Sequence, residues 1–224
     1  MTMSLIARDR ATGAFGVVIA SSSPAVAARC AHPRAGVGVV ASQNVTNPAL
    51  GPAILDRLAH GTDAPSALAA TLAEERFGEY RQVSVVDAQG NTAVHSGEKS
   101  LGTYHAVRGD GAVAAGNMLH HPTVIDALLT GYSHASGVFE ERLLHALQAA
   151  LAAGGEEGPV HSAGLLVVED VPWPVTDLRI DYVDDDPLAG LRRLWELWQP
   201  QKADYRVRGV DPTIAPSYGV PGDL

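Results

Sequence analysis

Aromatic residues, basic residues and cysteine are all scarce in this chain of 224 residues. Each shortage restricts the kind of core, the covalent cross-links or the partners that the protein can have. Aromatics make up only 5% of the residues, so the core has to be built from Ala, Val and Leu, which suits closely stacked layers of sheet and helix. Cys30 is the single cysteine, which excludes an intrachain disulfide framework. The length suits one large domain or two small ones, because domains commonly hold about 100–200 residues.

The shortage of positive charge argues against a nucleic-acid partner. Lys and Arg total 16 against 25 Asp and Glu, which gives a net charge of −9, and no basic stripe reverses the sign locally. Long apolar runs are missing as well, since none approaches the roughly 20 residues that a membrane-spanning helix needs. The N-terminus (MTMSLIARDR) lacks the basic and apolar segments of a signal peptide. We therefore expect a cytoplasmic protein with no nucleic-acid or membrane partner.

What the sequence does contain is a series of short apolar runs separated by turns. Residues 2–7 and 14–20 flank a turn that includes Gly13, which is the signature of a hairpin. Residues 21–34 are small and polar and are expected to form a loop, whereas residues 35–43 (AGVGVVASQ) predict a third strand. Because the runs are continuous and do not alternate, both faces of these strands are expected to be covered.

The rest of the chain alternates pairs of helices with groups of strands. Asn47, and then Thr62 or Asp63, are suitable N-caps for two consecutive helices whose Ala and Leu spacing fits one buried face. The further predicted strands are 82–87, 92–96, 111–117, 162–169 and 176–183, and the predicted helices are 48–60, 63–76, 122–129, 138–153 and 187–198. This order lacks the strict strand–helix alternation of a doubly wound parallel sheet.

The order of elements predicts an α+β fold with four layers, α/β/β/α. Two stacked, largely antiparallel sheets would be flanked by pairs of helices. No linker divides residues 1–198, so we expect them to form one domain. Residues 199–224 are rich in Pro, Asp and Gly, and we expect an extended tail that lies over the surface or reaches a neighbouring subunit. A homo-oligomer is accordingly a further expectation.

Several separate segments match one family in the right order. They are residues 1–9 (MTMSLIARD), 16–21 (GVVIAS), 34–38 (RAGVG), 46–48 with 51–52 (TNP, GP), 116–119 (GNML), 162–167 (SAGLLV) and 177–181 (DLRID). On these segments the chain, over about residues 1–198, resembles the bacterial domain of unknown function 1028 family, usually placed in the N-terminal-nucleophile (Ntn) hydrolase superfamily. The resemblance implies the αββα fold but no known reaction, because the family is largely uncharacterised.

Two positions depart from the pattern of that family. A Gln usually precedes the Gly-Asn pair, but this chain has Ala115 there. A Gln also commonly precedes the Ser-Ala block, where this chain has His161. If either Gln binds substrate in the family, this protein has another substrate or none.

The resemblance gives the role of nucleophile to Thr2. In an Ntn hydrolase the hydroxyl of an N-terminal Thr attacks a carbonyl, and the α-amine of the same residue takes the proton. An α-amine suits this task because its pKa is about 7.7–8.0. Thr2 follows the initiator Met1, and methionine is generally removed before small residues, which would free the amine. The alternative is that Thr is simply a common second residue and a good strand former.

The resemblance also implies two partners for Thr2. Arg34 looks like the cation that superfamily members place at the start of the third strand, where it would lower the pKa of the amine. Asn117 resembles the Asn with which some Ntn amidases bind an oxyanion. The structural alternatives are a solvated Arg at a strand end and an Asn that satisfies backbone groups in a turn.

Serines close to the expected site are candidates for binding. Ser21, Ser22 and Ser23 end the second strand, where they could bind the α-amine or a substrate, or simply cap a loop. A third option is a hydrolase with an internal nucleophile, which would be Ser4, Ser21 or Cys30. Basic neighbours of Cys30 could lower the pKa of its thiol.

The remaining patterns point to no metal or cofactor. No spacing of metal ligands, phosphate-binding loop, dinucleotide fingerprint or nucleophile elbow occurs. We therefore predict an amidohydrolase that cleaves a small amide or peptide-like bond with Thr2 as nucleophile and base, Asn117 as oxyanion donor and Arg34 as electrostatic partner. The competing prediction is a non-catalytic Ntn-like fold that binds a small molecule or serves in an assembly.

Overall fold

The computed structural model describes residues 2–220. Its strands are β1 (Thr2–Arg8), β2 (Phe15–Ser21), β3 (Ala31–Arg34), β4 (Gly38–Asn44), β5 (Arg81–Asp87), β6 (Thr92–Ser96), β7 (His105–Gly109), β8 (Ala112–Asn117), β9 (Ser162–Val168) and β10 (Thr176–Ile180). They form a six-stranded sheet in the order β10-β9-β2-β1-β8-β7 and a four-stranded sheet in the order β3-β4-β5-β6. Every described strand pair is antiparallel.

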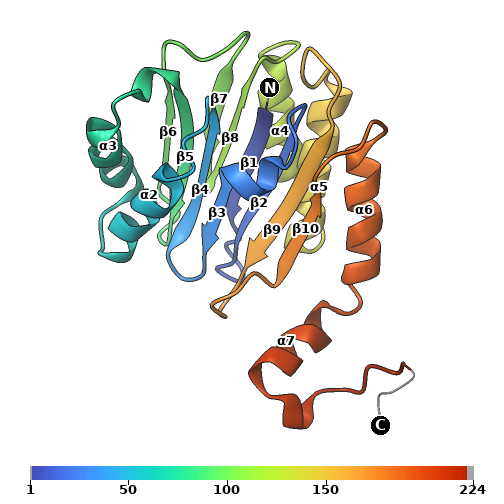
Figure 1. The fold of residues 1–224 in the computed structure, drawn as a ribbon. Coiled ribbons are helices and arrows are strands. Elements are labelled where there is room, and N and C mark those ends of the chain that lie inside the picture. Colours follow the sequence, from blue (N-terminus) through green and yellow to red (C-terminus); the bar gives the residue numbers. More distant parts are fainter. Residues whose placement is uncertain (1, 221–224) are drawn as a thin grey trace.

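The two sheets lie face to face, and helices cover their outer faces (Figure 1). The helices are α1 (Val26–Cys30), α2 (Leu50–Ala59), α3 (Ala64–Glu74), α4 (Thr123–His134), α5 (Phe139–Ala152), α6 (Pro187–Trp198) and α7 (Lys202–Val210), with 3₁₀ turns at η1 (Gly78–Tyr80) and η2 (Pro212–Ile214). Helices α4, α5 and α6 pack on the six-stranded sheet, and α2 and α3 pack on the four-stranded sheet. The predicted four-layer α/β/β/α fold is confirmed.

Alternation along each strand divides the core into layers. In β1, Met3 and Leu5 point to the helices, whereas Ile6 points to the four-stranded sheet. Thr2 and Ser4 share the face of Ile6, because side chains two positions apart lie on the same side of a strand. The first residues of β1 therefore contribute polar groups to the layer between the sheets.

Local elements differ from the prediction where the apolar pattern is short. Residues 21–34, expected as a loop, contain the five-residue helix α1 and the short strand β3. Strand β7 was not predicted, because it is an edge strand whose residues are mostly half-buried and show no clear period. None of the helices within residues 2–220 is long and apolar enough to cross a membrane.

The C-terminal segment is partly helical. Residues 202–210, which we expected to be extended, form α7 below the layered domain in Figure 1. The Lys202 amine binds the carboxylates of Glu140 and Glu169, each at 2.6 Å, so charge pairing ties this helix to the domain. Residues 221–224 of the expected tail lie outside the described residues.

Candidate functional site

The layer between the sheets has a polar end and an apolar end. The polar end consists of Thr2, Ser4, Ser21, Gln43, Gln82 and Asn117, all of them buried. The apolar end consists of Ile6, Phe15, Val17, Val39, Val86 and Val113. The same strands supply both ends, because each strand that faces the other sheet changes from polar to apolar side chains along its length.

Thr2 contributes the first side chain of β1 to the polar end. It begins β1, which runs between β2 and β8, and it pairs with Asn117 across the sheet. The Thr2 hydroxyl oxygen is 3.3 Å from the hydroxyl oxygen of Ser21, and the Thr2 residue is 6% exposed. The Ser21 hydroxyl also accepts the N–H of Ser23 at 3.0 Å. The predicted neighbourhood of Thr2, Ser21 and Asn117 is therefore present in the structure.

A chain of side-chain amides holds Asn117 in place. Asn117 Nδ2 donates to Gln82 Oε1 at 3.2 Å, and Gln43 Nε2 donates to the same oxygen at 2.9 Å. The Ser4 hydroxyl donates to Gln43 Oε1 at 2.7 Å. Gln82 Nε2 in turn donates to the Gly116 carbonyl at 3.1 Å. These bonds run from one sheet to the other, so a rigid framework fixes the amide of Asn117.

Sequence reasoning missed Glu156, a carboxyl group buried beside this end. The residue is 6% exposed, and its Oε2 accepts the backbone N–H of Ser22 at 3.2 Å. Oε1 is buried without a hydrogen-bond partner among the described residues. Burial raises the pKa of Glu156 to about 7. No signal in the sequence marks this residue, because it follows Gly154 and Gly155 in what reads as an ordinary helix-ending loop.

The structure does not bring Arg34 to Thr2. Arg34 ends β3 and pairs with Gly38, whereas the polar end is reached only at Gln43, the far end of β4. Its guanidinium binds the Asp56 carboxylate at 2.8 Å, near solvent. The predicted role of Arg34 beside the amine is corrected accordingly: the residue lies at the opposite end of the sheet.

Ser22 and Ser23 contribute mainly through their backbone. The Ser22 N–H binds Glu156, and the Ser23 carbonyl accepts the hydroxyl of Ser162 at 2.6 Å. Both serine residues are half-buried. Of the three serines that were candidates for binding, Ser21 is the one whose hydroxyl contacts Thr2.

The family model for the family of unknown function DUF1028 matches residues 2–191. The chain belongs to the DUF1028 family. A solved DUF1028 structure, protein SPO2555 from Silicibacter pomeroyi, is 31% identical, covers 91% of this chain and 89% of its own, and has a TM-score of 0.84.

More distant structural matches are Anbu proteins. Anbu (ancestral beta-subunit) from Yersinia bercovieri is 12% identical with a TM-score of 0.42, over 89% of this chain and 95% of that one. The Gly-1 mutant of Anbu from Hyphomicrobium sp. strain MC1 is 15% identical with a TM-score of 0.41, over 90% and 96%. The comparison with curated proteins gives no match.

The two positions that depart from the DUF1028 pattern lie close to the polar end. Ala115 has no polar side chain to offer, but its carbonyl accepts Gln43 Nε2 at 3.2 Å. The backbone N–H of His161 binds the Ser21 carbonyl at 2.9 Å. The His161 ring stacks on Tyr182 at a centroid distance of 4.9 Å, and its Nδ1 lies 2.8 Å from the Val183 carbonyl. The His161 ring is thus engaged away from Thr2.

Cys30 is not activated in this DUF1028 protein. Its thiol is buried and lies 3.4 Å from the Thr46 hydroxyl. Burial raises the pKa of the Cys30 thiol, and this effect outweighs the lowering contributed by the bond to Thr46 and by the charge of Arg29. Among residues 2–220, no group of three His, Cys, Asp or Glu side chains is arranged to hold a metal ion.

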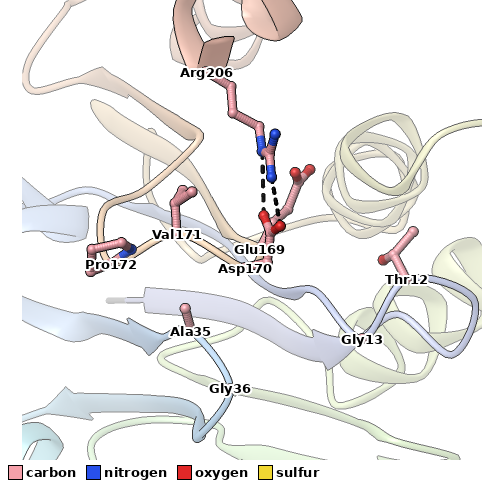
Figure 2. Close-up of a pocket in the computed structure, with 9 residues that line it drawn as sticks. All are labelled: Thr12, Gly13, Ala35, Gly36, Glu169, Asp170, Val171, Pro172 and Arg206. Carbon is pink, nitrogen blue, oxygen red and sulfur yellow. Dashed lines mark hydrogen bonds and ion pairs between the residues drawn. The ribbon is translucent and has the colours of Figure 1, made fainter. Parts of the chain in front are cut away.

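A surface cavity of about 680 Å³ lies far from the polar end. Figure 2 shows it between the turn at Thr12 and Gly13, the turn at Gly36 and the Asp170–Arg206 ion pair. These turns join the ends of strands opposite to Thr2, so this cavity cannot deliver a substrate to the Thr2 hydroxyl.

Proposed function

We propose that this protein is an Ntn-type amidohydrolase that cleaves a small amide or peptide-like bond with Thr2 as its nucleophile. The observation that carries the proposal is the placement of the Thr2 hydroxyl in the polar end, next to Ser21 and opposite Asn117. Toward the other end of the same layer the side chains are apolar, so the polar groups gather at the start of β1, the one place where an N-terminal amine would be available. Membership of the DUF1028 family by itself assigns no reaction.

The proposed reaction needs a free α-amine on Thr2. Once Met1 has been removed, the neutral amine takes the hydroxyl proton while Oγ1 attacks the carbonyl carbon of the amide. The amine then gives this proton to the leaving nitrogen, and water releases the acyl group from Thr2. The Ser21 hydroxyl, 3.3 Å from Oγ1, orients the Thr2 side chain for this attack.

Asn117 is the proposed donor to the oxyanion. An amide nitrogen carries two hydrogens, and Gln82 accepts one of those on Asn117 Nδ2. The bonds among Gln43, Gln82 and Ser4 hold the amide fixed before the substrate arrives, which is what makes a donor effective in a transition state.

A second candidate is a non-catalytic protein that binds a small molecule or serves in an assembly. The strong burial of Thr2 and Asn117, at 6% and 1% exposure, favours it, because a substrate has to reach both residues. The presence of Ala115 in place of the Gln of the family favours it as well.

Amide hydrolysis by untagged protein separates these candidates. A library of small amides is tested with the wild-type protein, Thr2→Ala and Thr2→Ser, with Thr130→Ala on the exposed side of α4 as the matched control. We expect Thr2→Ala to lower the rate of amide hydrolysis more than about a thousandfold, and Thr2→Ser to retain part of the wild-type rate. Equal rates for wild type and Thr2→Ala would reject the proposal, and no hydrolysis by any variant together with retained ligand binding would favour the second candidate.

A further inference from the structure

The segment that contains Glu156 lies next to the N-terminal end of β1. In the strand register, Met3 pairs with Ala20 on β2 and with Gly116 on β8. If both registers are continued by two residues from Met3 toward the start of the chain, the paired positions are Ser22, which follows β2, and Met118, which follows β8. The segment of Glu156 bonds to both positions: its carboxylate accepts the Ser22 N–H at 3.2 Å, and the N–H of the next residue donates to the Met118 carbonyl at 3.1 Å.

The position of Glu156 is built into the fold. Its backbone forms an antiparallel bridge with Leu119, two residues after the end of β8, and the preceding Gly155 carbonyl accepts the N–H of His120 at 3.1 Å. The carboxyl group is therefore held between the continuations of β2 and β8, in line with β1. Because β1 begins at Thr2, the α-amine of the processed chain would lie at this end of the strand.

We propose that the Glu156 carboxylate binds the α-ammonium of Thr2 in the processed chain and accepts a proton from it. The inference rests on the proposed function and adds the group that holds its base and shares a proton with it. Three features support it: the carboxyl group is 6% exposed, it has one oxygen without a hydrogen-bond partner among the described residues, and it lies across the end of the strand that Thr2 begins.

The proton movements balance. One N–H bond of the ammonium breaks and an O–H bond forms on Glu156, which leaves a neutral amine beside a neutral carboxylic acid. This amine takes the proton of the Thr2 hydroxyl as Oγ1 attacks and returns it to the leaving nitrogen, while Glu156 keeps its own proton. Burial raises the pKa of Glu156 to about 7. A free α-amine titrates at about 7.7–8.0, so the proton is shared between groups of similar affinity.

Other titratable side chains around Glu156 do not compete for this role. Glu157 and His120 are exposed. His161 lies on the far side of Ser21, and its ring nitrogen Nδ1 is 2.8 Å from the Val183 carbonyl.

The titration of the Thr2 amine tests the inference. The chain is prepared with Thr2 as its first residue by cleaving off a removable leader, so the result does not depend on processing in the cell. The ¹³C shifts of Thr2 are followed against pH by NMR in the wild type, in Glu156→Gln and in Glu157→Gln as the control. Glu156→Gln keeps the shape of the side chain and an oxygen for the Ser22 N–H.

We expect two coupled titration steps for wild type and for Glu157→Gln, because the amine and the carboxyl group interact. Glu156→Gln should show one step, with the pKa of the amine lowered by about 1–3 units because the ammonium has lost its counter-charge. Coincident curves for Glu156→Gln and wild type would overturn the inference. If that variant does not fold, a single wild-type step at about 7.7–8.0 would overturn it equally.

The two proposals can fail separately. If Glu156→Gln shifts the titration but Thr2→Ala retains amidase activity, the contact stands and the proposed function fails. If Thr2 is essential for hydrolysis but the Thr2 titration curve is the same in wild type and in Glu156→Gln, the proposed function stands and the role of Glu156 fails.

Discussion

The two ends of the layer between the sheets are made from the same strands but are stabilised differently, one by apolar packing and the other by hydrogen bonds between buried side chains. At the apolar end, Ile6, Val39 and Val113 pack with no polar group to satisfy. At the polar end, Gln43 and Gln82 are equally buried and are accommodated only because their amides bond to each other and to Asn117. Burying polar groups costs free energy unless each finds a partner. The apolar end therefore needs only close packing, whereas the polar end needs a matched set of hydrogen bonds.

The largest effect on stability is expected at the apolar end. Ile6 lies on the same face of β1 as Thr2, but it is fully buried among apolar side chains. Ile6→Ala should lower the free energy of unfolding by about 2–5 kcal/mol, because it leaves a cavity between the sheets. Urea unfolding measures this loss of stability. The rate of amide hydrolysis per folded molecule should stay unchanged. A loss of activity in the folded fraction would contradict the separation of the two ends.

In contrast to Ile6→Ala, Asn117→Ala should mainly lower the rate of catalysis and should change stability less. Removal of one oxyanion donor is expected to lower kcat by about 100–1000-fold. Steady-state kinetics on an amide found in the library screen measure the change, with urea unfolding alongside. A kcat within twofold of wild type would remove Asn117 from the mechanism.

The amides of Gln43 and Gln82 should behave as a unit. Each single change to Leu leaves a buried partner without its bond and should cost about 1–3 kcal/mol of stability. The double variant removes both partners and should cost less than the sum of the single changes. A thermodynamic cycle from urea unfolding measures this coupling, and strict additivity would show that the framework is not cooperative.

Arg34→Ala should have the smallest effect. Its ion pair with Asp56 lies near solvent, and such pairs contribute about 0–1 kcal/mol. Because Arg34 lies at the far end of the sheet, amide hydrolysis and its pH dependence should match those of the wild type. A tenfold change in rate would restore the electrostatic role that the structure removes.

The layers of this fold could be predicted from the sequence because strands and helices carry strong local signals. Helix α5 was predicted at 138–153 and spans Phe139–Ala152, ending before Gly154. Of the two predicted N-caps for α3, Thr62 and Asp63, the Asp63 carboxylate is the one that caps the helix, by accepting the N–H of Ser66 at 2.8 Å. Edge strand β7 could not be predicted, because its half-buried residues show no alternation of apolar and polar side chains.

The site could be predicted only in part, because its members meet through tertiary structure. Thr2 and Asn117 were found through a family resemblance, and strand pairing brings them together. Arg34 was misplaced because the predicted third strand begins at residue 35, whereas the chain turns there between β3 and β4. Glu156 and the Gln framework depend on partners more than 30 residues away in sequence, which no local pattern records.

The intact mass of the untagged protein tests the central claim most directly. We predict a mass lower than that of the full sequence by one methionine, which would give Thr2 the free α-amine that its proposed role as base requires. A mass that retains methionine would contradict the account, because Thr2 would then carry an amide nitrogen that cannot accept a proton.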